Sequence, residues 1–197
     1  MSAEQVYRIA LVLSLLVWLA LETWNQVRDM RRDVSDGVDR DRGSLAVMLS
    51  LSLLSVFSAI GIATVTQGVF VLPWRYSVVE FGAGMALLWV GLALRVWSIV
   101  TLGALFHRRV VIRRDHRVVR DGPYRLLRHP SYTGAILTGI GVGILLGSWI
   151  SLAVLVVLPV AGYLYRVRVE EEALRRELGA PYADYARGTW RLIPFVW

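Results

Sequence analysis

The sequence predicts an all-α, polytopic membrane protein with five transmembrane helices, a C-terminal helical hairpin and polar segments on the cytoplasmic side. Hydrophobic residues make up 56% of its 197 residues, which is more than a soluble domain of this size can bury. Its apolar runs reach the length of about 20 helical residues that crosses a bilayer. The net charge of +7 comes from arginines, without any lysine, and these arginines gather between the apolar runs.

The predicted spans follow the apolar runs in chain order. The first runs from about Tyr7 to Trp24, the second from Leu45 to about Leu72 and the third from about Val78 to Leu102. Residues Ser131 to Tyr165 hold two shorter apolar runs, joined at Gly147-Ser148-Trp149, where small residues favour a tight turn. These two runs predict a helical hairpin that supplies spans four and five.

The arginines predict the orientation, because short cytoplasmic loops carry an excess of positive charge. Arginines crowd loops 25–43 and 103–130 and the tail after the fifth span, whereas the opposite side carries Arg8 and Arg75. We therefore expect an integral protein of the plasma membrane whose N-terminus lies outside. Both arginine-rich loops and the C-terminal tail are then cytoplasmic, where soluble cofactors would reach them.

Residue types exclude several kinds of site. The chain has no cysteine, which excludes disulfides, thiolate nucleophiles and iron–sulfur clusters. Three histidines without close spacing make a poor metal site, so we expect no metal. The arginine clusters lie between apolar runs, where lipid headgroups and topology explain them without nucleic acid. Gly139, Gly141 and Gly143 spell part of a dinucleotide fingerprint, but no strand precedes them, and their spacing favours close helix packing.

Two polar segments flank the predicted hairpin and carry the candidate functional residues. The first has a turn at Gly122-Pro123 and ends in Arg128-His129-Pro130-Ser131-Tyr132. Proline disfavours helical geometry at the residue before it and suits the first turn of a helix, so we expect His129 at the entrance of the fourth span. Such an entrance offers free N–H groups and the positive end of the helix dipole, which suit an anionic group such as an amino-acid carboxylate.

The second polar segment continues from the fifth span. Arg166 and Glu170 are four residues apart, so on a helix they share a face and form an opposite-charge pair. Two interpretations stay open: a surface ion pair with arginines that snorkel at the membrane edge, or a functional pair. Tyr182 and Tyr185 either pack the tail helix onto the bundle or serve the site. His107 is interpreted as a membrane-interface side chain.

Read together, these positions resemble one known family. From residue 101 to residue 197 the chain is similar to the isoprenylcysteine carboxyl methyltransferase family and its prokaryotic relatives, whereas residues 1–100 resemble it only in being transmembrane helices. The similarity is carried by His116-x-Val118-Val119-x-x-Gly122-Pro123-Tyr124-x-x-x-Arg128-His129-Pro130-Ser131-Tyr132, Arg166-x-x-x-Glu170-Glu171-x-x-Leu174, Gly179-x-x-Tyr182-x-x-Tyr185 and Arg191-Leu192-Ile193-Pro194. Residues 1–100 thus form helices one to three with a charged cytoplasmic loop, and residues 101–197 the catalytic methyltransferase region.

The resemblance implies an enzyme that moves a methyl group from S-adenosylmethionine to the carboxylate of a lipophilic, isoprenylcysteine-like acceptor. It implies that the cofactor is bound by His116, Arg117, Val118, Val119, Tyr124, His129, Pro130, Ser131, Tyr132, Glu170 and Glu171. It places Arg166 on the acceptor side, where the guanidinium orients the carboxylate, and makes Arg166 and Glu170 the catalytic pair. The implied partners are a lipidated or small lipophilic acceptor and membrane lipids; the sequence sets no oligomeric state.

The sequence departs from the animal enzymes of this family at two points that concern the acceptor. The chain lacks the extra N-terminal spans of the animal enzymes, and it has Arg109 where they have an amide. The resemblance therefore defines the cofactor better than the acceptor.

The chemistry agrees with these implied roles. Methyl transfer from a sulfonium is an in-line displacement, so the protein has to align donor and acceptor and exclude water. An arginine fork holds a carboxylate by two hydrogen bonds, and a carboxylate acceptor needs no general base. Because both polar segments flank one hairpin, we expect a cofactor cavity at the cytoplasmic membrane edge. The tail would roof this cavity, and a lateral opening would admit the acceptor from lipid.

Three other functions stay open at the level of sequence. A phospholipid or other amine could be the methyl acceptor, with Glu170 or Glu171 as the base. A membrane sterol-reductase-like enzyme would use NADPH, and the arginines of residues 108–128 could bind its phosphates. A non-catalytic membrane scaffold is the third.

Overall fold

The computed structural model describes residues 3–30, 37–65, 77–113 and 117–197. Six α-helices account for most of them, in the order α1 (Ala3–Met30), α2 (Ser44–Val65), α3 (Val78–Leu102), α4 (Pro130–Leu146), α5 (Trp149–Leu178) and α6 (Ala180–Arg187). Two short 3₁₀ helices, η1 (Gly103–Leu105) and η2 (Gly122–Arg125), lie between α3 and α4. The predicted second span reaches beyond α2, and its last residues fall outside the described ranges.

Four of these helices, α1, α2, α3 and α5, are long and apolar enough to cross a membrane. The fourth predicted span, α4, is an apolar helix of 17 residues, which is at the lower limit for a crossing. Large apolar side chains such as Leu19, Phe57 and Val157 are more than half exposed, as expected for surfaces that face lipid. The fold is that of a helical integral membrane protein, and the count of five spans stays a prediction.

The hairpin forms at the predicted position. Gly147 ends α4 in the left-handed conformation, with a φ of 66°, which glycine adopts without strain. Ser148 caps α5, because its side-chain oxygen accepts a hydrogen bond from the N–H of Ser151. The helix α5 then continues well past the predicted end at Tyr165, which carries the second polar segment out on the same rigid helix.

Glycines let α4 lie between α3 and α5. A Cβ atom on Gly141 would lie 2.5 Å from the amide nitrogen of Leu88 in α3. On the other face, a Cβ on Gly143 would lie 2.6 Å from Leu152 of α5. The glycines that resemble a dinucleotide fingerprint therefore serve helix packing, as their spacing predicts.

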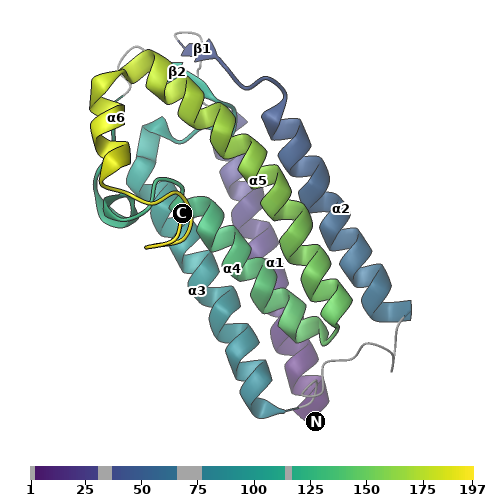
Figure 1. The fold of residues 1–197 in the computed structure, drawn as a ribbon. Coiled ribbons are helices and arrows are strands. Elements are labelled where there is room, and N and C mark those ends of the chain that lie inside the picture. Colours follow the sequence, from purple (N-terminus) through teal and green to yellow (C-terminus); the bar gives the residue numbers. More distant parts are fainter. Residues whose placement is uncertain (1–2, 31–36, 66–76, 114–116) are drawn as a thin grey trace.

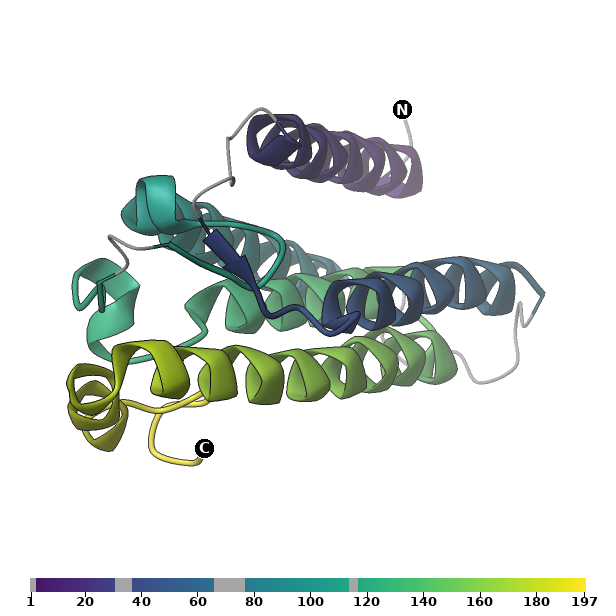
Figure 2. The same ribbon diagram turned by 90° about the horizontal axis from the view of Figure 1, so that it is seen from above.

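The helix α1 stands apart from α2, α3, α4 and α5, as the view from above shows (Figure 2). Tyr7 stacks on Phe81 of α3 at a ring distance of 4.1 Å. Near the other end, Glu22 forms an ion pair with Arg95 of α3, and Arg95 also donates to the hydroxyl of Ser131 at 2.9 Å. One aromatic stack and a few polar contacts, rather than extensive packing, hold α1 to the bundle.

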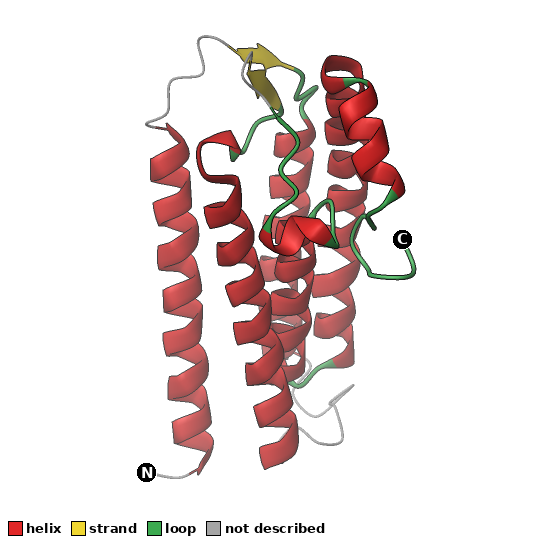
Figure 3. Ribbon diagram, turned by 90° about the vertical axis from the view of Figure 1, so that its left-hand side faces the viewer, coloured by secondary structure: helices red, strands yellow, loops and turns green. Residues whose placement is uncertain are grey.

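Most non-helical segments gather at one end of the bundle (Figure 3). There β1 (Gly37–Asp39) pairs antiparallel with β2 (Val111–Arg113), with Val38 opposite Ile112. The sequence does not predict this pairing, because both strands are short stretches within charged loops. The pair joins the loop before α2 to the loop after α3 and so closes one side of the polar end.

Candidate functional site

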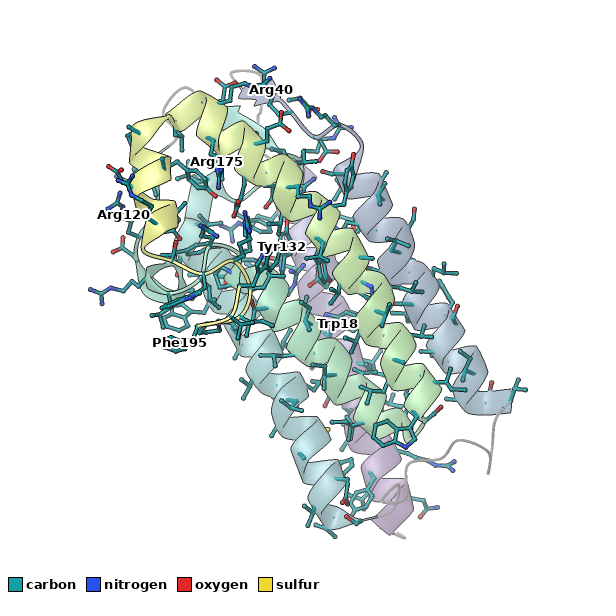
Figure 4. The ribbon with its side chains drawn as sticks, viewed as in Figure 1. Trp18, Arg40, Arg120, Tyr132, Arg175 and Phe195 are labelled. Atoms are coloured by element: carbon teal, nitrogen blue, oxygen red, sulfur yellow. The ribbon has the colours of Figure 1, made fainter. Side chains whose placement is uncertain are left out.

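A cavity lies at the polar end of the bundle, between the last turns of α3 and α5, the entrance of α4 and the tail helix α6. It is lined mainly by apolar and aromatic side chains, with a few charged groups among them. The lining residues are Leu102, Leu105, Phe106, His107, Arg109, Val110, Arg117, Val118, Val119, Tyr124, Arg128, His129, Ser131, Tyr132, Glu170, Leu174, Leu178, Tyr182 and Tyr185. Side chains crowd this region around Tyr132 (Figure 4).

The tail is hydrogen-bonded to the segment that leads into α4. The N–H of Arg128 donates to the carbonyl of Trp190 at 2.7 Å, and the N–H of His129 donates to that of Arg191 at 3.1 Å. In the reverse direction the N–H of Trp190 donates to the carbonyl of Leu126 at 3.0 Å. This short parallel pairing fixes the backbone at the entrance of α4 and holds the tail beside the cavity.

His129 lies at the entrance of α4, as predicted, and Pro130 is the first residue of the helix. The imidazole is buried, with Nδ1 3.2 Å from Oε2 of Glu170 and Nε2 3.6 Å from Oε1 of Glu171. Burial works against the charged form, but the attraction of these two nearby carboxylates outweighs it and raises the pKa of His129 above its ordinary value. His129 therefore binds a proton more readily than an exposed histidine.

Glu170 links α4 and α5 at the cavity wall. Its Oε1 accepts from the Tyr132 hydroxyl at 2.6 Å and from Nε of Arg166 at 2.7 Å. Tyr132 in turn stacks between His129, at a ring distance of 5.7 Å, and Tyr163, at 5.0 Å. The result is a fixed carboxylate at the edge of an aromatic wall.

Arg166 is one of the most deeply buried side chains, with 1% of its surface exposed. Besides Glu170 it contacts the carboxylate of Asp41, the hydroxyl of Ser44 at 2.8 Å and the carbonyl of Arg108. The interpretation of Arg166 and Glu170 as a snorkelling surface pair is therefore wrong. Arg166 also does not line the cavity, because its nitrogens point to protein groups on three other segments.

Asp41 and Arg166 stabilise each other across the start of α2. Burial works against the charged carboxylate of Asp41, yet the N–H of Leu45 and the guanidinium of Arg166 hold its pKa below the ordinary value. A buried arginine needs such compensation, since an unpaired charge away from water is strongly destabilising.

Glu171, which does not itself line the cavity, is the centre of a second charge cluster. Its carboxylate accepts from both Nε and Nη2 of Arg191, at 3.1 and 3.0 Å, and lies 3.0 Å from Nε of Arg128. Arg191 belongs to the tail, so Glu171 joins α5 to the tail. These contacts favour a structural role for Glu171 in place of direct contact with a cofactor.

Most of the predicted cofactor residues surround the cavity. Those that line it are Arg117, Val118, Val119, Tyr124, His129, Ser131, Tyr132 and Glu170. Pro130 is fully buried and, like Arg166 and Glu171, lies outside the lining. His116 falls outside the described residues.

His107 and the two tail tyrosines also line the cavity, although they were not among the predicted site residues. The side chain of His107 is 3% exposed, and its Nδ1 lies 3.3 Å from Asp29 of α1, so the interpretation as an interface side chain is wrong. Tyr182 and Tyr185 both pack the tail helix onto the bundle and line the cavity. The repeat of tyrosine at a spacing of three was the available sequence signal, but it is typical of either role.

The two tail tyrosines differ in their hydrogen bonds. The hydroxyl of Tyr185 contacts the carbonyls of Tyr124 and Leu127 at 2.8 and 3.3 Å, whereas the buried hydroxyl of Tyr182 has no hydrogen-bond partner among the described residues. Burial raises the pKa of Tyr185 to about 12 and that of Tyr182 further, so both stay protonated near neutral pH. Buried polar groups are rarely left without a partner, so the Tyr182 hydroxyl is available to hydrogen-bond a ligand in the cavity.

No group of three or more histidines or carboxylates that could hold a metal ion occurs among the described residues. The lining combines apolar and aromatic walls with the fixed carboxylate of Glu170, the imidazole of His129 and the phenol of Tyr182. That combination suits a ligand with aromatic, cationic and hydrogen-bonding parts.

The part of the chain that holds most of the cavity is similar to known proteins. Residues 84–176 match the model of the isoprenylcysteine carboxyl methyltransferase (ICMT) family, which confirms the family resemblance. The match begins within α3, before the predicted start at residue 101, and it ends before the tail motifs at Gly179 and Arg191. Protein-S-isoprenylcysteine O-methyltransferase B of Arabidopsis thaliana is 32% identical over 115 residues, covering 57% of this chain and 58% of that protein. Protein-S-isoprenylcysteine O-methyltransferase of Schizosaccharomyces pombe is 30% identical over 129 residues, covering 64% of this chain and 54% of its own length.

A solved structure has a similar fold. The eukaryotic intramembrane Ras methyltransferase ICMT superposes with a TM-score of 0.58 at 24% identity, covering 73% of this chain and 52% of that chain. The chain thus spans little more than half the length of these relatives. The matched part holds the hairpin, most of the cavity and its charged groups.

Proposed function

Because residues 84–176 match the isoprenylcysteine carboxyl methyltransferase family, we propose that the chain is an integral membrane methyltransferase that uses S-adenosylmethionine. Its acceptor is the carboxylate of a lipophilic, isoprenylcysteine-like molecule. The observation that carries the proposal is the position of the cavity: the family's motif residues from two distant segments line it together, at the polar end of apolar helices.

The residues of the cavity fit S-adenosylmethionine. This molecule has an aromatic base, several hydrogen-bonding groups and a positively charged sulfur. Apolar and aromatic walls from η1, η2 and α6 suit the base, and the carboxylate of Glu170 suits the positive charge. The unpartnered hydroxyl of Tyr182 supplies a hydrogen bond that nothing in the described protein uses. Arg117, Val118, Val119, Tyr124, His129, Ser131 and Tyr132 would complete the binding surface.

The bound cofactor supplies an electrophilic methyl group, and the protein supplies alignment. Glu170 is held by Tyr132, Arg166 and His129, so it presents a charge in one fixed position. Preorganised charge of this kind stabilises a reacting complex without rearrangement during the reaction. The tail, joined to α5 by Glu171 and Arg191, covers the cavity and keeps water out.

The acceptor would reach the cavity from the membrane. A lipophilic molecule avoids the free-energy cost of exposing its apolar chain to water if it enters between the helices. Its carboxylate is already nucleophilic near neutral pH, so the site needs no general base. An acceptor-side role for Arg166 stays a prediction; its contacts to Glu170, Asp41 and Ser44 favour a positioning role, in which the guanidinium fixes Glu170.

Two measurements on the purified protein test this function. Equilibrium binding of radiolabelled S-adenosylmethionine in detergent tests the cofactor. Methyl transfer to N-acetyl-S-farnesylcysteine tests the acceptor, with the methyl ester of the same compound as a control that lacks the free carboxylate. We expect binding, and a labelled product that releases methanol in base, as a methyl ester does. A base-stable product with an amine lipid would instead identify an amine acceptor, and absence of cofactor binding would refute the proposal.

A further inference from the structure

The tail ends in a closed turn. The carbonyl of Ile193 accepts from the N–H groups of Val196 and Trp197, at 3.2 and 3.1 Å. The N–H groups of Leu192 and Ile193 donate back to the carbonyl of Trp197, at 3.0 and 3.1 Å. Pro194 and Phe195 form the corner of this turn. We call residues 193–196 the tail turn. Four backbone hydrogen bonds thus give this short segment one defined shape.

The tail turn is fixed to the entrance of α4. Leu192, which precedes it, is buried, and its carbonyl accepts from the hydroxyl of Thr133 at 2.7 Å. Arg191 is held by Glu171 and lies over the ring of Trp197 at 4.9 Å. The turn therefore projects from an anchored base.

The side chains that the tail turn presents are apolar and exposed. Phe195 is 83% exposed, Val196 74% and Ile193 54%. Phe195 also has a φ of 65°, in the left-handed region that glycine favours, which costs about 1–2 kcal/mol for other residues. A water-facing turn would be expected to carry glycine and polar residues at such positions. The exposed side chains indicate that this turn does not face water.

A series of contacts links the exposed side chains of the tail turn to α3. Phe195 packs on Trp190 at a ring distance of 4.6 Å, and Trp190 is hydrogen-bonded to Leu126, which is 57% exposed. Leu126 follows η2, which packs on α3: a Cβ on Gly122 would lie 3.1 Å from the indole nitrogen of Trp97. Figure 4 shows Phe195 well away from Arg40, which lies at the tip of the polar end.

We propose that the tail turn inserts into the interface of the bilayer that surrounds α3 and α4, so that the tail is bound to the protein at its base and to lipid at its tip. The partner is the phospholipid bilayer itself. Aromatic residues such as Trp190 and Phe195 are typical of this depth, and the exposed Arg125 beside Leu126 can meet lipid phosphates.

The absence of cysteine allows a direct test with single-cysteine variants. Phe195→Cys and Val196→Cys would each be labelled with an environment-sensitive fluorophore and reconstituted into phosphatidylcholine–phosphatidylglycerol vesicles. Leu13→Cys, from the exposed lipid face of α1, is the membrane control, and Asp184→Cys, on the exposed face of α6, is the water control. Quenching by nitroxide-labelled lipid and by aqueous iodide would be compared at each site.

We expect labels at positions 195 and 196 to emit at shorter wavelength than the label at 184. They should be quenched several-fold more by nitroxide lipid than by iodide, as at position 13. Val196→Cys keeps the test valid if Phe195→Cys disturbs the packing on Trp190, because Val196 is a second exposed residue of the same turn. If the labels at both positions respond to iodide as the label at 184 does, the tail turn lies in water and the proposal fails.

Discussion

Tyr182 and Tyr185 occupy neighbouring turns of α6, yet only the hydroxyl of Tyr185 has hydrogen-bond partners among the described residues. We expect Tyr182→Phe to weaken S-adenosylmethionine binding about two- to tenfold, the worth of one hydrogen bond, while the melting temperature stays the same or rises. Tyr185→Phe is the matched control: it removes contacts to backbone carbonyls, so it should lower the melting temperature. Equal cofactor affinity in Tyr182→Phe and the wild type would show that this hydroxyl has no ligand.

Arg166 offers a second test at the scale of single residues. Arg166→Ala leaves buried Asp41 and Glu170 without their cation, so we expect a loss of about 3–5 kcal/mol in the free energy of unfolding. Arg166→Lys should rescue little of this stability, because the single ammonium of lysine cannot replace a guanidinium that hydrogen-bonds to groups on several segments. Arg168→Ala, on the exposed face of the same helix, should be nearly neutral.

The double variant Arg166→Met/Asp41→Asn separates the two possible roles of Arg166. It removes the cation together with one of its buried anions and should recover much of the stability. A positioning role through Glu170 predicts that this variant loses both cofactor affinity and turnover. Wild-type cofactor affinity with a large loss of turnover would instead support a direct contact with the acceptor.

The stability of the folded protein should depend on pH through His129, in a direction that its raised pKa determines. Glu170 and Glu171 of α5 face its ring, and the cations Arg128 and Arg191 share the carboxylate of Glu171. Its native pKa is raised, so its contribution to stability is complete below the unfolded value of about 6.5 and is lost as the pH rises through the native pKa. Melting temperatures in detergent from pH 6 to 9 should fall more for the wild type than for His129→Gln. Parallel curves would contradict this assignment.

At the scale of elements, the tail is expected to act as a cover that Glu171 holds in place. Arg191→Gln breaks the two-nitrogen contact with Glu171, so we expect S-adenosylmethionine to dissociate faster and bind about tenfold more weakly. Arg176→Gln is the control, because Arg176 pairs with exposed Glu172 and does not contact the tail. Similar dissociation rates of S-adenosylmethionine from both variants would show that the tail packs on the bundle without retaining the cofactor.

Local sequence patterns predicted the helices and the hairpin turn. They could not predict which segments distant in the sequence contact one another. The hairpin could be placed because Gly147 and Ser148 carry the turn and the cap within two residues. The pairing of β1 with β2 could not, because each strand is three residues long and its partner lies about seventy residues away. Arg166 shows the same limit: its i+4 neighbour Glu170 was evident, whereas Asp41 is 125 residues away in sequence.

At the scale of the whole molecule, the arginine distribution predicts that the cavity end faces the cytoplasm. In intact cells, Asp184→Cys should react with a membrane-impermeant maleimide only after permeabilisation. Val79→Cys, exposed at the first turn of α3 and at the opposite end of the bundle, should react at once. The reverse pattern would invert the topology and move the cavity to the outside.

The Glu22–Arg95 pair has a consequence for the order of assembly during synthesis. Glu22 leaves the ribosome with α1, whereas its partner Arg95 follows only with the end of α3. Each charge alone within lipid costs about 3 kcal/mol or more. Pairing with Arg95 removes the cost of an unpaired Glu22, so the association of α1 with the bundle is favoured once α3 has been made. The same contact that joins two helices in the finished protein thus favours one order for their assembly.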